Sequence, residues 1–262
     1  MSVHVDALGL AGPGLAGWQE SIALLADEGS YRTGECPRCT SKLLPANERR
    51  RLPATARMAL QVAEEAMAQS SLAIDDVCSV FATCHGDTDI INNICIALAE
   101  PERSVSPTQF HNSVHNAAAG YWAIAAHSPM PSTTVCAYHA SFVAGLMEAV
   151  AQLRVEARPV LLVAYDCPVP DPLAPLAGAY EPFAVAMVLT PDATSQSTRL
   201  NIETVSQQPV QAMNCAELEG LRVSNPAARG LPLLRVLATG ASGRVLLSHV
   251  HGLQLAVNVV AP

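Results

Sequence analysis

The sequence predicts an α/β protein in which a mostly parallel mixed sheet is covered by helices, and three observations predict it. Half of the 262 residues are apolar while aromatic residues make up only 4%, so Ala, Val and Leu can build a sizeable core. Strand-like segments alternate along the chain with segments of helical periodicity. Residues 160–165 are apolar on both faces, as a strand in the middle of a parallel sheet is.

The individual elements follow from local patterns. Apolar runs bounded by Gly, Pro or polar residues predict strands at residues 3–10, 77–83, 133–137, 160–165, 183–190, 199–206, 245–249 and 253–259, the last two as a terminal hairpin. Apolar positions three and four residues apart predict helices at residues 15–26, 53–69, 89–98, 117–126, 141–154 and 231–238. We expect Asn47 to cap a short turn and residues 100–109 and 167–179 to be loops, whereas residues 209–229 show no clear pattern.

Charge and composition exclude several classes of protein. The net charge is −8 and the mean hydropathy +0.25, so we expect no nucleic-acid partner. The longest apolar run is too short to cross a bilayer and no signal peptide is evident, so we expect a cytoplasmic protein. The eight cysteines are irregularly spaced, and the motif Cys36–Cys39 lacks two further ligands at zinc-site spacing. We therefore expect neither a metal nor a cofactor.

The stretch from Pro131 to Ser141 is the candidate functional element. A Pro-Ser turn starts a β-branched strand, and residues 136–141 form an elbow that leads into the helix predicted from Ser141. The N-terminus of such a helix favours negative charge, because its first N–H groups are unpaired. The elbow is therefore a suitable place for a nucleophile.

Several motifs resemble those of the β-ketoacyl synthases of the thiolase fold. The early helix pattern of that family matches Leu44-Pro45, Arg49-Arg50-Arg51, Ala59-Leu60 and Ala63. The family's loop, small-residue helix and nucleophile strand match Ser106-Pro107, Asn116, Ala119-Gly120 and Pro131-Ser132 in order and spacing. The resemblance covers about residues 3–205, and it implies a single thiolase-like domain over residues 1–262. In this interpretation residues 1–205 correspond to the ketosynthase N-terminal half.

Two departures from the family pattern bear on catalysis. The family's nucleophilic cysteine falls at position 139, where this chain has His139, and the nearest thiol, Cys136, lies three residues earlier. Only 72 residues follow Thr190, so we interpret residues 206–262 as a reduced remnant of the second half. The histidines that support decarboxylative condensation in that half are not found. We expect His139 to fill the vacated pocket, with a role as base or nucleophile as the alternative.

The resemblance implies a non-catalytic partner subunit. Short chain-length factors, as in aryl-polyene biosynthesis, have lost the cysteine and pair with a full-length catalytic ketosynthase to shape the acyl tunnel in polyene, polyketide or fatty-acid-like biosynthesis. The resemblance also implies an acyl carrier protein as a partner, which would bind through the complex. Carried over by position, the tunnel and interface residues are Gln109, Phe110, His111, Asn112, Thr133, Thr134, Val135, Cys136 and Ala137.

Two other functions remain open. The chain could be an acyltransferase or minimal synthase that uses Cys136 as nucleophile, although a strand thiol that faces the core is usually inert. It could also be a scaffold that docks an acidic carrier protein through Arg49, Arg50 and Arg51, the densest positive cluster in the sequence. For each of these functions, a homodimer of this chain is the alternative to a heterodimer with a ketosynthase.

Overall fold

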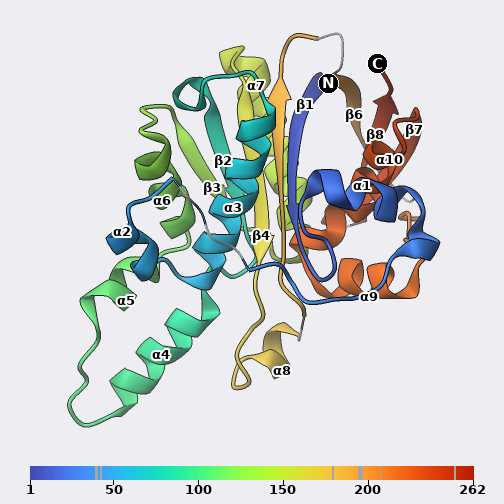
Figure 1. The fold of residues 1–262 in the computed structure, drawn as a ribbon. Coiled ribbons are helices and arrows are strands. Elements are labelled where there is room, and N and C mark those ends of the chain that lie inside the picture. Colours follow the sequence, from blue (N-terminus) through green and yellow to red (C-terminus); the bar gives the residue numbers. More distant parts are fainter. Residues whose placement is uncertain (39–40, 42, 179, 194–196, 207, 251) are drawn as a thin grey trace.

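The computed structural model describes residues 1–262 except 39–40, 42, 179, 194–196, 207 and 251. Within the described residues the strands form one eight-stranded sheet in the order β3-β2-β4-β5-β1-β6-β8-β7 (Figure 1). The strands are β1 (Ser2–Ala11), β2 (Cys78–Ala82), β3 (Ser132–Val135), β4 (Val160–Asp166), β5 (Phe183–Thr190), β6 (Thr198–Ser206), β7 (Gly243–Ser248) and β8 (Leu253–Val260). The α/β class, the mixed sheet and the terminal hairpin are thus confirmed.

The proportion of parallel pairing is smaller than predicted. Strand β2 pairs in parallel with β3 and with β4, and every other pairing in the sheet is antiparallel. The apolar run in β4 predicted parallel neighbours on both sides, but β5 runs antiparallel to it. A strand sequence that is apolar on both faces indicates that both faces of the strand are covered. It does not indicate the direction of the neighbouring strands.

Helices cover both faces of the part of the sheet that contains β2, β4, β5 and β1. On one face lie α3 (Ala54–Gln69) and α6 (Ala117–Ala126), packed against Phe81 and Leu161 of the sheet. On the other face α1 (Trp18–Ala26) lies against β1 and α7 (Ser141–Glu156) against β2 and β4, while α9 (Ala216–Ser224) and α10 (Leu231–Thr239) extend this layer, with α10 packed against β7 and β8. The apolar side chains three and four residues apart that predicted the helix at 141–154 form the buried face of α7, namely Phe142, Leu146, Ala149, Val150 and Leu153.

Local differences from the predicted elements have identifiable causes. A short helix, α5 (Pro107–Asn112), occupies the end of the predicted loop at 100–109, because proline is compatible with the first turn of a helix. Another, α8 (Ala174–Ala177), lies within the predicted loop at 167–179. Helix α2 (Ala46–Arg51) has Pro45 in the capping position, so the expected cap at Asn47 is wrong: its side chain bonds to Glu48 inside the helix.

Two helices extend away from the layered body as an arm made of α4 (Thr88–Ala99) and α5 (Figure 1). Helix α4 is mostly apolar in sequence, yet none of its residues is buried. Ile91, Ile96 and Leu98 are exposed on it, and Phe110 of α5 is 71% exposed. A helix of this composition is typical of one that is buried against another surface.

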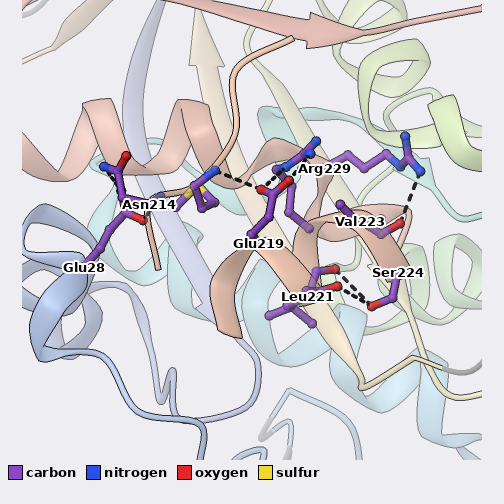
Figure 2. A network of polar contacts seen from close by, with 10 residues as sticks. Glu28, Asn214, Glu219, Leu221, Val223, Ser224 and Arg229 are labelled. Carbon is purple, nitrogen blue, oxygen red and sulfur yellow. Dashed lines mark hydrogen bonds and ion pairs between the residues drawn. The ribbon is translucent and has the colours of Figure 1, made fainter. Parts of the chain in front are cut away.

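A buried carboxylate joins the C-terminal segment to the start of the chain. Glu28 accepts hydrogen bonds from the backbone N–H groups of Asn214 (2.6 Å) and Cys215 (2.8 Å), and from Arg235 (2.8 Å). Figure 2 shows Glu28 beside Asn214, whose segment continues to Glu219 and α9. Burial by itself raises the pKa of Glu28, but these hydrogen bonds and the positive charge of Arg235 hold it below its usual value.

We expect Glu28→Ala to destabilise the chain by about 2–4 kcal/mol, because the substitution leaves Arg235 and two N–H groups without their acceptor. Urea unfolding followed by circular dichroism measures the loss. Glu48→Ala, which removes a half-exposed carboxylate near the surface of α2, is the control and should change the free energy of unfolding far less. Equal effects of both substitutions would contradict the role assigned to Glu28.

Candidate functional site

The C-terminal ends of the three parallel-paired strands lie together. Thr83, Cys84 and His85 follow β2, the elbow follows β3, and Asp166 is the last residue of β4. In open α/β sheets this edge is where ligands bind and where active-site residues gather. The elbow predicted from the sequence therefore lies at the expected place in the fold.

The elbow is a 3₁₀ turn, Tyr138–Ala140, that leads directly into α7. Tyr138 has a φ of 52°, in the left-handed region that non-glycine residues seldom adopt. Ser141 supports the turn: its Oγ accepts from the N–H of Ala137 (3.0 Å) and donates to the carbonyl of Tyr138 (2.7 Å). The strained position of the turn thus carries a phenol, with His139 next to it and no thiol.

Three rings cluster at the elbow. The Tyr138 ring lies 4.0 Å from that of His139 and 5.9 Å from that of His85, centroid to centroid. His139 Nδ1 and His85 Nε2 are buried and have no hydrogen-bond partner among the described residues. Burial lowers the pKa of both imidazoles, and for His139 the neighbouring Arg229 and His85 lower it further. The lowered pKa favours the neutral form of the His139 imidazole, which packs against the Tyr138 ring.

Sequence reasoning missed Asp166, which is 1% exposed. Its Oδ1 accepts from the Thr83 hydroxyl (2.9 Å) and from the N–H of Cys84 (2.8 Å), while its Oδ2 has no partner among the described residues. Burial raises the pKa of Asp166 to about 7, although these hydrogen bonds lower it. An aspartate after the six apolar residues 160–165 was the available signal, since a charged residue at the end of a buried strand is uncommon.

A segment far along the chain closes over this edge of the sheet. Asn225 is fully buried and donates to the carbonyl groups of Asp166 (3.2 Å) and Glu181 (2.8 Å), while its side-chain oxygen accepts from the N–H of Ala227 (2.8 Å). Arg229 follows and donates to Val223, as Figure 2 shows. These residues belong to the stretch 209–229 that had no predicted structure.

The thiols of the site lack the features of a nucleophile. Cys136 follows the end of β3 and is exposed, so the expectation that it faces the core is wrong. Neighbouring protein atoms and the Asp166 carboxylate raise the pKa of the Cys136 thiol, and burial raises the pKa of Cys84 to about 12. Because the thiolate is the reactive form, both cysteines are less reactive than a free cysteine.

The predicted tunnel residues of α5 fall into two groups. Asn112 is buried, where it donates to the Arg51 carbonyl (3.0 Å) and accepts from the Tyr121 hydroxyl (2.9 Å). The His111 ring lies against that of Tyr121 at 6.3 Å. Gln109 lines a cavity of about 250 Å³ beside α4, and Phe110 points into solvent. Asn112 and His111 therefore hold α5 in place, whereas Phe110 is free to contact another molecule.

Strand β3 lies at one edge of the sheet and carries Thr133, Thr134 and Val135 of the predicted interface residues, whereas Cys136 and Ala137 follow its end. The Thr133 hydroxyl accepts from Gln152 of α7 (2.8 Å), and Val135 packs against the core on the same side. Thr134 faces the other way, where it lines a cavity of about 420 Å³ beside α6, and its hydroxyl is buried without a partner among the described residues. The outer hydrogen-bonding edge of β3 has no neighbouring strand in the described sheet.

The described residues contain neither a candidate metal site nor a candidate membrane-spanning helix. No cluster of three or more His, Cys, Asp or Glu side chains in the described part of the chain could hold a metal ion. Cys39 of the Cys-x-x-Cys motif lies outside the described residues. None of the helices in the described ranges is long and apolar enough to cross a bilayer.

The fold and the elbow define the class of the protein as ketosynthase-like α/β. The comparison of the sequence with protein families identifies the family to which it belongs. The model of the family "Beta-ketoacyl synthase, N-terminal domain" matches residues 18–243, so the chain belongs to that family. No curated protein matches the sequence significantly.

Three solved structures resemble the chain over almost its whole length. One is the ketosynthase ApeO in complex with its chain length factor ApeC from Xenorhabdus doucetiae, with a TM-score of 0.77 and 24% identity over 98% of this chain and 99% of the other. Another is the ishigamide ketosynthase/chain length factor, with a TM-score of 0.71 and 15% identity over 100% of both chains. A third is AntDE:AntF, a type II PKS acyl-carrier protein in complex with its ketosynthase bound to the hexaketide, with a TM-score of 0.78 and 11% identity over 100% of this chain and 99% of the other.

Proposed function

We propose that this chain is a non-catalytic partner subunit of a β-ketoacyl synthase, a chain-length factor that shapes the acyl tunnel of a heterodimer. The observation that carries the proposal is the elbow: Ser141 holds its turn by hydrogen bonds, but the turn has Tyr138 and His139 where it would present a nucleophile. The partner would supply the reactive cysteine, and this chain would supply the wall that limits how far the acyl chain can grow.

Two surfaces support an obligate partner. The outer edge of β3 can extend the sheet of another subunit, because no strand in the described part of the chain pairs with it on that side. The arm of α4 and α5 presents Ile91, Ile96, Leu98 and Phe110 to solvent, although these side chains are apolar. Exposed apolar surface of this extent is typical of a face that is covered in an assembly.

The structural comparisons support the same proposal. Two of the three similar structures are described as a ketosynthase with a chain length factor, and in each case the alignment spans nearly all of both chains. The third includes an acyl carrier protein, which we propose meets this chain through the complex. Because the identities are below 25%, these similarities establish the fold, and the role of this chain rests on the elbow and the two surfaces.

The test is to co-produce the chain with a full-length, cysteine-containing ketosynthase and to measure subunit stoichiometry, acyl adducts and product length. We expect a one-to-one complex in which only the ketosynthase becomes acylated, and in which His139→Ala leaves condensation largely intact. Phe110→Ala should lengthen the products, because it removes an exposed ring that we place at the tunnel floor. Products of unchanged length from an intact complex would contradict the chain-length role.

The alternative, an acyltransferase or minimal synthase that uses Cys136, receives less support from the structure. The raised pKa of Cys136 works against thiolate formation, and no histidine in the described residues hydrogen-bonds to its sulfur. That alternative requires a covalent acyl mass on this chain that Cys136→Ser removes. Intact-mass measurement after incubation with acyl thioesters separates the two functions.

A further inference from the structure

An arginine-lined cavity lies away from the elbow. Its volume is about 650 Å³, and it lies between the segment before α2, α2 itself and the start of α3. We call it the arginine cavity; its lining residues are Arg38, Ser41, Ala46, Arg49, Arg50, Leu52 and Arg57. Among the described residues, every ionisable group that lines it is a guanidinium, although the chain as a whole carries a net charge of −8.

Few of the guanidinium charges of the cavity have a counter-charge among the residues that the structure describes. In the described part of the chain, Arg38, Arg49 and Arg50 form no ion pair with a carboxylate, whereas Arg51, which does not line the cavity, lies 3.6 Å from Glu48. Arg57 donates to the Leu52 carbonyl (2.8 Å), which fixes one guanidinium at the rim. Four like charges around one hollow repel one another, so an anion between them would relieve the repulsion.

Ser41 is a second and independent sign of a ligand. The residue is 1% exposed, it lines the same cavity, and its hydroxyl has no hydrogen-bond partner among the described residues. A buried hydroxyl without a partner is uncommon in folded proteins because it loses its bonds to water. An oxyanion in the cavity would accept a hydrogen bond from it.

We propose that the arginine cavity binds the phosphate group of a phosphate ester. Guanidinium groups bind phosphate oxygens in pairs of parallel hydrogen bonds, and the Ser41 hydroxyl completes the set of donors. Leu52 and Ala46 provide apolar wall for the organic part of the ester. The cavity is large enough for both parts, and the proposal does not depend on a ketosynthase partner.

Calorimetric titration of the full chain with 4′-phosphopantetheine, and with pantetheine as the same molecule without phosphate, tests the proposal. We expect saturable binding of the phosphorylated probe only, weakened by rising salt. Arg50→Gln should weaken this binding about tenfold to a hundredfold, because it removes a charge-assisted contact. Ser41→Ala should weaken it less, since the four arginines remain.

The control is Arg158→Gln, which makes the same change of charge at an exposed arginine outside the cavity. It should leave binding unchanged, and circular dichroism checks that every variant is folded. Equal binding of both probes, no saturable binding at millimolar concentration, or an equal loss in the control would overturn the proposal. A carrier protein can be tested with and without its phosphopantetheine arm. Tighter binding of the form with the arm would identify the ligand as a carrier-borne ester, and equal binding of the two forms would identify it as a free ester.

Discussion

Thr134→Pro is expected to weaken the proposed heterodimer strongly while the isolated chain stays folded. The backbone of β3 bonds to β2 at alternate residues: the carbonyl groups of Pro131 and Val135 accept from Ser79 (3.0 Å) and Thr83 (3.1 Å). By that alternation the N–H and C=O groups of Thr134 point to the open edge of the sheet. A proline there removes the outward donor and leaves the pairing with β2 intact.

The expected loss of affinity is at least about tenfold to a hundredfold, because the missing hydrogen bond lies at the centre of the proposed interface and the proline ring displaces the partner strand. Size-exclusion chromatography with light scattering measures the one-to-one complex, and circular dichroism reports on the fold of the variant alone. A complex that forms normally with Thr134→Pro would show that the partner does not add a strand to β3.

Thr134→Val is the matched control for the proline variant. It keeps the backbone N–H and the β-branched shape, and it removes only a buried hydroxyl that has no partner among the described residues. We therefore expect the complex to persist and the isolated chain to gain about 1 kcal/mol of stability. Loss of the complex in both variants would instead assign the effect to the side chain.

The sequence predicted the layered body well because its signals are local. The helix 117–126 was predicted with the bounds that α6 has, and the elbow was placed at the turn between β3 and α7. The apolar periodicity that predicted a helix at residues 141–154 corresponds to the buried face of α7. Each of these features is specified by residues within one or two turns of one another, so a single sequence is sufficient to find them.

What the sequence did not predict depends on contacts between distant residues. Glu28 bonds to Arg235, and Asn225 reaches back to Asp166, so the order of the segment 209–229 is fixed by partners that no local pattern indicates. The direction of β5 relative to β4 is likewise a property of the chain path between them. The orientation of Cys136 was misjudged because β3 ends at Val135, one residue before the thiol.

Asp166→Asn is expected to change how stability depends on pH. The carboxyl titrates at about 7 in the folded chain and at its ordinary value of 3.8 when unfolded. Between these values the unfolded state releases a proton that the folded state retains, so wild-type stability falls as pH rises and levels off above about pH 7. The amide cannot titrate, so the variant should lose this decline.

The free energy of unfolding of the variant, relative to that of the wild type, should therefore rise between about pH 4 and pH 8, by on the order of 4 kcal/mol. Urea unfolding at a series of pH values measures the difference. Asp171→Asn, a substitution at an exposed aspartate five residues further on, should follow the wild type throughout. A constant difference across the range would mean that the Asp166 carboxyl is already ionised in the folded chain at low pH.

The same experiment bears on the elbow because the two are connected through Thr83. The Thr83 hydroxyl donates to Asp166 (2.9 Å), and the Thr83 carbonyl lies 3.2 Å from the Ser141 hydroxyl that supports the turn at Tyr138. Ionisation of Asp166 strengthens the first of these hydrogen bonds, since a charged acceptor binds a donor more tightly than a neutral one. A protonation change at the end of β4 therefore acts on the residues that set the geometry of the elbow, and through them on the surface next to the proposed partner.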